Sequence, residues 1–135
     1  MEAASLPIEK QVCSLDLAKR LKELGVKQES YFLWKQLFSD TPDKWHVSIR
    51  EVNGRVLQKK CIAAFTVAEI GEMLGLGRWV TFKTSRGWEW QYTGNGPLPI
   101  NNDGKAADTE ADARAKMLIY LLENNLIAPS ATSAA

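Results

Sequence analysis

The sequence predicts an α+β protein in which a mostly antiparallel sheet is covered on one face by about three helices. Two observations indicate this class. Three segments carry apolar residues at helical spacing, whereas the segments between them alternate between apolar and polar residues or are rich in aromatic ones. The predicted elements follow the order α-β-β-β-α-β-β-α, with two hairpins and one further strand. Because hairpins join antiparallel neighbours, we expect one sheet with the helices packed on its apolar face.

The length of 135 residues suits a single domain with an ordinary core. We expect residues 8–127 to form the folded core, and residues 1–7 and 129–135 to be mobile tails because they hold few large apolar side chains. A net charge of +1 provides no global field that would attract nucleic acid or anionic lipid. No apolar run is long enough to span a membrane, and no secretory signal is visible, so we expect a cytoplasmic protein.

The first helix is predicted to begin after Ser14, a residue type that caps helix N-termini. Leu17, Leu21 and Leu24 then recur at helical spacing. Gly25 follows and can adopt the left-handed conformation that ends a helix.

Residues 31–38 are rich in aromatic and aliphatic side chains, and fit either a buried strand or a short helix. We favour a strand, since aromatic residues suit a pleated surface. Residues 45–52 alternate between apolar and polar and predict a second strand. Asn53-Gly54 is typical of a type I′ hairpin turn, so a return strand beginning at Arg55 is expected to pair with residues 45–52, and lysines near its end suit a sheet edge.

The second helix is predicted to begin at Thr66, which forms a capping box with Glu69. Phe65 and Ile70 stand where a hydrophobic staple would place them. Gly75 marks the end of this helix.

A second hairpin follows, and its register can be predicted from the pattern of side chains. If residues 85–87 form a three-residue loop, Gly87 takes the left-handed bulge position and all large apolar residues fall on one face. This register predicts three cross-strand pairs: Thr84 with Trp88, Phe82 with Trp90, and Val80 with Tyr92. The opposite, polar face would hold Thr81, Lys83, Glu89 and Gln91.

Residues 94–107 form a long segment rich in Gly, Pro and Asn, which we expect to be either mobile or functional. The last helix is predicted to begin near Thr109, with Asp112 as its capping partner, and to end near Asn124. Asn125 can supply the left-handed residue at its C-terminus.

Three helical segments, residues 14–26, 64–74 and 111–118, carry a resemblance to known sequences. In this order they resemble a group of small uncharacterised proteins encoded by bacteriophages and prophages. The resemblance implies a phage or mobile-element origin, and hence the cytoplasm of a bacterial host cell. No activity is established for that group, so the resemblance assigns no functional residue.

Catalytic and metal-binding chemistry is sparse in the sequence. His46 is the only histidine, and no local spacing pairs it with a nucleophile or an orienting acid. Cys13 and Cys61 lack metal-ligand spacing, and we expect both to be buried free thiols. We therefore predict no catalytic residue, metal site or cofactor, and lean towards a protein that is not an enzyme.

Positive charge is concentrated in one region. Residues 44–92 hold eight Lys or Arg and four Glu, and also four of the five tryptophans. We expect a non-catalytic accessory or interaction protein that binds a macromolecular partner, with a protein partner favoured. Its candidate surface is the polar face of the hairpins, which comprises Arg50, Lys59, Lys83, Arg86 and Gln91.

The alternative function is a single-stranded nucleic-acid-binding module that uses the same cations together with Trp79 as a stacking ring. The predicted register argues against a wider stacking platform, because it places Trp88 and Trp90 in the core. A small enzyme is the least favoured reading, given the missing catalytic set.

Overall fold

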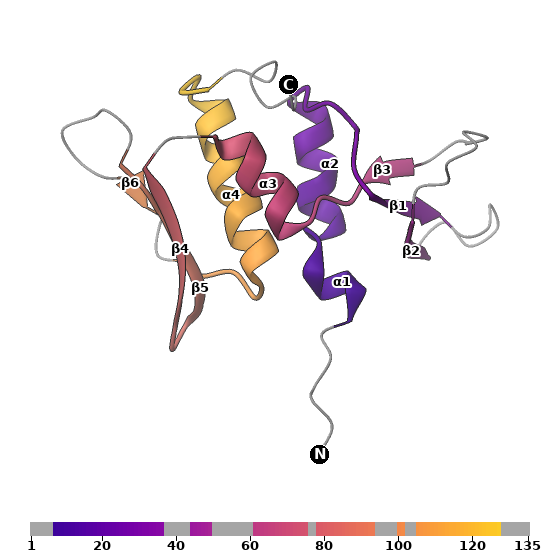
Figure 1. Cartoon of the computed structure of the whole chain (residues 1–135), viewed down its shortest axis with the longest axis horizontal. Coiled ribbons are helices and arrows are strands. Elements are labelled where there is room, and N and C mark those ends of the chain that lie inside the picture. Colours follow the sequence, from indigo (N-terminus) through magenta and orange to yellow (C-terminus); the bar gives the residue numbers. More distant parts are fainter. Residues whose placement is uncertain are drawn as a thin grey trace.

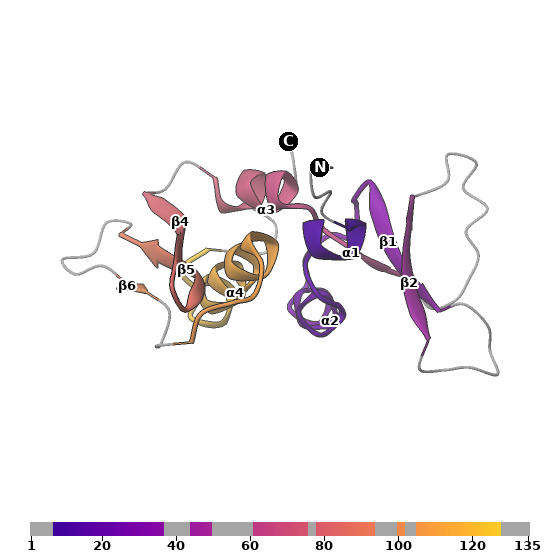
Figure 2. The same ribbon diagram turned by 90° about the horizontal axis from the view of Figure 1, so that it is seen from below.

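The structure is a computed structural model, and it describes residues 7–36, 44–49, 61–75, 78–93, 100–101 and 105–127. Helices occupy the middle of the molecule, with one antiparallel sheet on either side of them (Figures 1 and 2). The predicted tails lie outside the described residues apart from Pro7.

The elements confirm the α+β class and the predicted order, with two short additions. The helices are α1 (Ile8–Gln11), α2 (Leu15–Glu23), α3 (Val67–Leu74) and α4 (Glu110–Glu123). The strands are β1 (Phe32–Gln36), β2 (Trp45–Ile49), β3 (Cys61–Ala63), β4 (Trp79–Thr84), β5 (Gly87–Tyr92) and β6 (Ile100–Asn101). The additions are α1 and β6, and β6 lies within the long segment whose order we could not predict. No helix among the described residues is both long and apolar enough to cross a membrane.

The strands form two sheets instead of the single sheet that we expected. One sheet has the order β2-β1-β3 and the other the order β4-β5-β6. A strand pattern reveals which face of a strand is buried, but it does not reveal which strands are neighbours. Here the helices separate the two groups, and each sheet turns one apolar face towards them (Figure 2).

The first sheet confirms the strand predicted within residues 31–38 but corrects the pairing of the strand that follows the Asn53-Gly54 signal. In its central strand, β1, Trp34 lies opposite Val47 of β2 on one side and opposite Ile62 of β3 on the other. The strand β3 therefore pairs with β1, where we had expected the chain to return beside residues 45–52. The turn itself, and residues 55–60 where the return strand was predicted to begin, lie outside the described residues.

The register of the second hairpin is also corrected, by one residue. Thr84 pairs with Gly87, which leaves a two-residue loop, and Phe82 lies opposite Glu89 instead of Trp90. The Thr84 hydroxyl explains the tighter loop: it donates to Glu89 Oε2 at 2.6 Å and accepts from the Arg86 backbone N–H at 3.2 Å. Gly87 has φ +131°, but it serves a close approach, since a Cβ there would lie 2.6 Å from the carbonyl oxygen of Ala107.

The predicted caps of α3 and the C-terminal caps of α2 and α4 are confirmed. Thr66 and Glu69 form the capping box, with Thr66 Oγ1 accepting from the Glu69 N–H at 3.1 Å. Gly25, at φ +92°, and Asn125, at φ +57°, are the left-handed residues that follow α2 and α4. Ser14 makes no capping bond with its side chain, and instead its backbone N–H donates to Asp112 Oδ1 at 2.6 Å.

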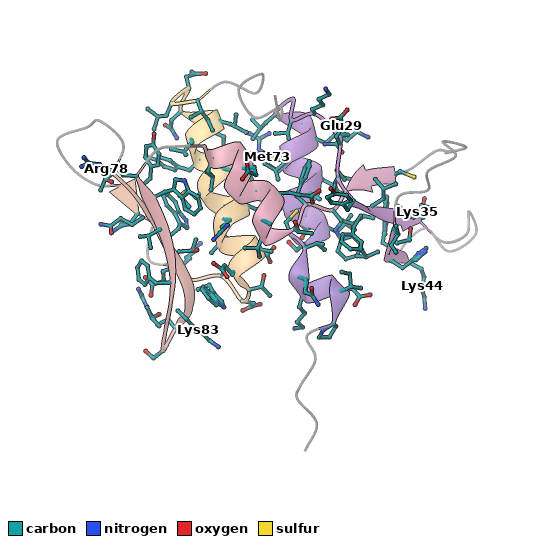
Figure 3. All side chains as sticks on the ribbon, in the orientation of Figure 1. Glu29, Lys35, Lys44, Met73, Arg78 and Lys83 are labelled. Carbon is teal, nitrogen blue, oxygen red and sulfur yellow. The ribbon has the colours of Figure 1, made fainter. Side chains whose placement is uncertain are left out.

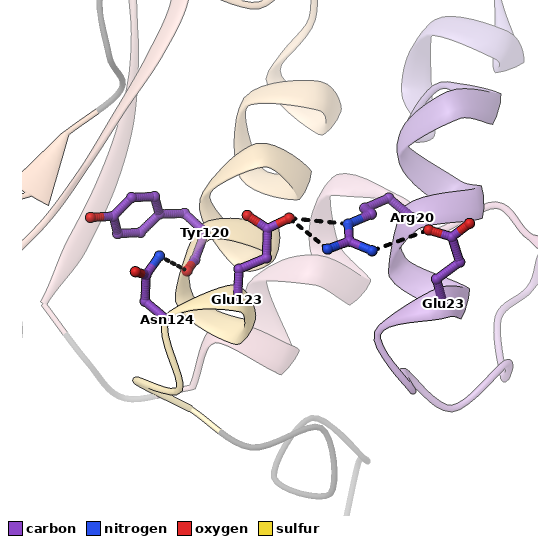
Figure 4. Close-up of polar contacts among 5 residues, drawn as sticks. All are labelled: Arg20, Glu23, Tyr120, Glu123 and Asn124. Atoms are coloured by element: carbon purple, nitrogen blue, oxygen red, sulfur yellow. Dashed lines mark hydrogen bonds and ion pairs between the residues drawn. The ribbon is translucent and has the colours of Figure 1, made fainter.

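The helix α4 is the centre of the core, in contact with the other three helices and with β4 and β5. Its buried residues are Ala111, Ala113, Ala115, Met117, Leu118, Leu121 and Leu122. At its C-terminal end, Arg20 of α2 donates to Glu123 at 2.9 and 3.0 Å and to Glu23 at 3.1 Å (Figure 4). These side chains are largely exposed, so we expect them to orient α2 against α4 more than to stabilise the fold.

Candidate functional site

Of the cations and the amide predicted to form one binding surface, the structure describes Lys83, Arg86 and Gln91, and it does not bring these three onto one face. Lys83 pairs with Trp88 and Gln91 pairs with Val80, so the observed register places Lys83 and Gln91 on opposite faces of the hairpin. Arg86 is exposed in the loop at one end of the hairpin, and Figure 3 shows Lys83 near that end and Arg78 near the other. Arg50 and Lys59 lie outside the described residues. The one-residue correction of the register thus removes the polar face that we had predicted.

The outward side of the hairpin is instead partly apolar. Val80 is 45% exposed and Phe82 is 39% exposed, and both point away from the helices that cover the other side. Glu89 and Gln91 of β5 share this side. We call these four residues the hairpin face.

The carboxylate of Glu89 adds little negative charge to the hairpin face, because it is nearly buried and paired. Its side chain is 11% exposed, and its oxygens accept from the Thr84 hydroxyl at 2.6 Å and from Arg86 Nη2 at 3.0 Å. The hairpin face therefore presents two apolar side chains beside a carboxylate that is already paired with Arg86, and such a surface is suited to contact with another apolar surface.

The hairpin is held firmly against the helices by Arg114 of α4. Its guanidinium donates to the backbone carbonyl of Val67 at 2.9 Å and to Glu110 Oε2 at 3.2 Å, and lies 4.8 Å from the ring centre of Trp79. Glu110 in turn accepts from the hydroxyl of Thr81 at 2.8 Å. Both Trp79 and Thr81 belong to β4, so this network fixes the position of that strand and with it the hairpin face.

Strand β4 lies at an edge of its sheet. Among the described strands its only partner is β5. Its six residues pair with β5 without interruption, so it contains no bulge, and none of them is a proline. Bulges, prolines and charged residues commonly protect an edge strand from pairing with another strand. Of these three, β4 has only the charge of Lys83.

The tryptophans of this region are poorly placed to stack on bases. Trp90 is 4% exposed and packs against Tyr120, with ring centres 5.7 Å apart, which confirms its predicted place in the core. Trp88 is half-buried, and Trp79 has one ring face covered by Arg114. Trp88 lines a cavity of about 400 Å³ between the hairpin and the first turns of α3 and α4. Cations and carboxylates both line this cavity, so its charge selects neither an anion nor a cation.

Titratable groups that could perform chemistry are scattered in the described part of the chain. No group of three or more His, Cys, Asp or Glu there could hold a metal ion. His46 is half-buried, and its Nδ1 has no hydrogen-bond partner among the described residues. Cys13 and Cys61 are both free, and Cys13 is buried as expected, whereas Cys61 is half-buried. Burial raises the pKa of the Cys13 thiol to about 12, so this thiol is not a nucleophile at neutral pH.

Sequence reasoning missed the exposed pair on the hairpin face because it used the wrong register. The alternation of Val80 and Phe82 with polar residues was visible, but it fits either face of the strand. The only local signal for the tighter loop was Thr84, whose hydroxyl can bond to the loop backbone. No protein-family model, curated protein or solved structure matches this chain, so its function has to be inferred from the geometry of this hairpin.

Proposed function

We propose that this chain is a non-catalytic accessory protein of phage or prophage origin that binds a protein partner through the hairpin face. The observation that carries the proposal is the exposure of Val80 and Phe82 on a hairpin that Arg114 holds against the helices. Exposed apolar side chains that are fixed in place bind a partner at a low cost in conformational entropy. Aromatic side chains in particular contribute strongly to interfaces, which makes Phe82 the expected anchor.

The charged residues near the hairpin loop fit the rim of such an interface. Lys83 and Arg86 are both exposed, and Arg86 also contacts Glu89 of the hairpin face. Charges at a rim contribute mainly to the rate and specificity of association. We therefore expect a partner whose surface combines an apolar centre with acidic residues at its edge.

A protein is favoured over single-stranded nucleic acid because of the tryptophans. Binding of single strands without sequence preference needs exposed rings on which bases stack, next to cations that contact phosphates. Cations are present beside the hairpin, but Trp90 is buried and Trp79 already lies against Arg114. Among the aromatic residues of the hairpin, Phe82 is then the exposed one, so it is the ring that a partner can contact.

The experiment is a capture of partners from bacterial lysate on the immobilised full chain. Three forms are compared: wild type, Phe82→Ser, and Tyr31→Ser as a matched control. Tyr31 is also an exposed aromatic residue, 75% exposed, but it lies beside the other sheet. We expect proteins retained by wild type and by Tyr31→Ser to fall at least about tenfold with Phe82→Ser, as for a residue at the centre of an interface.

Nuclease treatment of the lysate and an oligonucleotide titration separate the two kinds of partner. Capture that survives nuclease, with no quenching of tryptophan fluorescence by a mixed-sequence single-stranded oligonucleotide at low salt, supports a protein partner. Saturable quenching that weakens steeply with added salt would replace the proposal with the nucleic-acid alternative. Equal capture by wild type and Phe82→Ser would remove the hairpin face from the interaction.

A further inference from the structure

We infer that β4 pairs with β4 of a second copy of this chain, in antiparallel orientation across a two-fold axis, so that two hairpins form one continuous sheet. This inference uses the edge of the hairpin, whereas the proposed function uses its face. The two surfaces adjoin, and pairing through the edge would double the hairpin face.

The directions of the backbone groups show which residues of β4 face the free edge. Residues of an antiparallel pair alternate between those that bond their partner and those that direct N–H and C=O away from it. The carbonyl of Arg78 accepts from the N–H of Thr93, so at this position the backbone bonds across the hairpin. Trp88 exchanges both of its backbone bonds with Ala107, at 2.8 and 2.7 Å, on the side of β5 away from β4.

In β4, the residues that pair with Trp88 and with every second residue after it therefore direct their backbone groups away from β5. Lys83 pairs with Trp88, Thr81 with Trp90, and Trp79 with Tyr92. These three residues of β4 direct their backbone N–H and C=O groups to the edge where no described strand pairs. Unpaired groups in a row of this kind are a template for another strand.

A second copy fits this edge because the arrangement is self-complementary. If Thr81 lies opposite Thr81 of the second copy, Trp79 lies opposite Lys83 and Lys83 opposite Trp79. All the outward-facing groups then find partners, in about six hydrogen bonds between the copies. Sliding the strands by two residues would leave one of these residues in each copy without a partner in β4.

The side chains agree with this alignment on both faces of the sheet. On the hairpin face, Val80 lies opposite Phe82 of the second copy, so that the exposed apolar side chains of the two copies cover one another in part. On the other face, the ammonium of Lys83 comes beside the ring of Trp79, and a cation and an aromatic ring attract. An alignment centred on Lys83 would instead place two like charges in contact.

The test measures the molar mass of the full chain by sedimentation over a range of concentrations, with charge variants on the hairpin face. We expect a dimer for wild type and for the control Tyr31→Glu. Val80→Glu and Phe82→Lys each place a charge against an apolar side chain, and each should raise the dimer dissociation constant at least about tenfold. An equimolar mixture of the two variants should restore the dimer. In the mixed dimer the introduced carboxylate of one copy lies opposite the introduced ammonium of the other, and the remaining Phe82 lies opposite the remaining Val80.

Amide hydrogen exchange provides a second measurement on the same samples. Dimerisation should slow exchange at Trp79, Thr81 and Lys83 as the concentration rises, and leave the other residues of β4 unchanged. A wild-type monomer at every concentration, a dimer that persists in both single variants, or a mixture that stays monomeric would each overturn the inference. A monomer whose partner capture still depends on Phe82 would leave the proposed function standing, whereas a dimer with capture independent of Phe82 would overturn the proposed function alone.

Discussion

Gly71 lies inside α3, directly beneath the guanidinium of Arg114, and its replacement by alanine tests how firmly that side chain is held. A Cβ at this position would lie 2.6 Å from Nη1 of Arg114, while the nearest atom of another side chain, Cη2 of Trp79, would lie 3.7 Å away, at ordinary contact distance. Gly71→Ala therefore forces Arg114 to move and displaces nothing else.

Two effects of opposite sign determine the change in the free energy of unfolding. Alanine in place of glycine within a helix stabilises it by about 1 kcal/mol. Displacing Arg114 disrupts its bond to the Val67 carbonyl, at 2.9 Å, and its contact with Trp79. A hydrogen bond from a charged donor contributes about 1.5–3 kcal/mol, and the Arg114 side chain is 20% exposed, so we take the lower part of that range. With about 0.5–1 kcal/mol for the ring contact, the net expectation is a destabilisation of about 1–2 kcal/mol.

The assay is urea unfolding followed by circular dichroism, applied to a double-mutant cycle. In an Arg114→Met background the obstruction is gone, and Gly71→Ala should now stabilise the protein by about 1 kcal/mol. The coupling free energy between the two positions should then be about 2–3 kcal/mol. If Gly71→Ala stabilises both backgrounds equally, Arg114 moves aside freely, and the argument that it fixes the hairpin is wrong.

Four further predictions concern the helix ends and the buried thiol. Asp112→Ala removes the acceptor of the Ser14 N–H and should destabilise the protein by about 1–3 kcal/mol in urea unfolding, whereas Asp112→Asn should cost less because its amide oxygen can still accept. Burial raises the pKa of Asp112 above its ordinary value of 3.8, so the folded state binds the carboxyl proton more tightly than the unfolded state does. The resulting contribution to stability is present at low pH and is lost as pH rises through the folded-state pKa. Asp112→Asn should abolish this dependence of the free energy of unfolding on pH. Thr66→Ala removes the cap of α3 and should lower the free energy of unfolding by about 1 kcal/mol, and an unchanged value would contradict the capping geometry. In titration with a thiol reagent at neutral pH, Cys61 should react first and Cys13 only as the protein unfolds, whereas equal rates would refute the burial of Cys13.

The parts of the fold that could be predicted from sequence are those determined within a few residues. The capping box of Thr66 and Glu69, and the left-handed residues Gly25 and Asn125, were all readable because each signal and the bonds it makes lie within one helical turn. The strand at Phe32–Gln36 was predictable from residue type alone.

The parts that could not be predicted depend on contacts between distant residues. Ser14 was expected to cap its own helix, but its N–H binds Asp112, which lies 98 residues away. The hairpin register depends on the bonds of the Thr84 hydroxyl and on the close approach of Ala107 to Gly87. The spacing of apolar residues in the sequence does not reveal either contact. The candidate surface changed with the register, because a shift of one residue exchanges the two faces of a strand.

The central position of α4 has a consequence for how the chain folds as it is synthesised. The helix begins only at Glu110, yet it supplies the surface on which α2, α3 and the β4–β5 hairpin pack. Until that helix has left the ribosome, the apolar faces made earlier have no common partner to cover them. The hairpin can close early, since its partners are close in sequence, whereas assembly of the core must wait for the last described helix. During that interval the nascent chain would present an exposed β4 edge and uncovered aromatic side chains, which makes chaperone binding most valuable in the moments before α4 emerges.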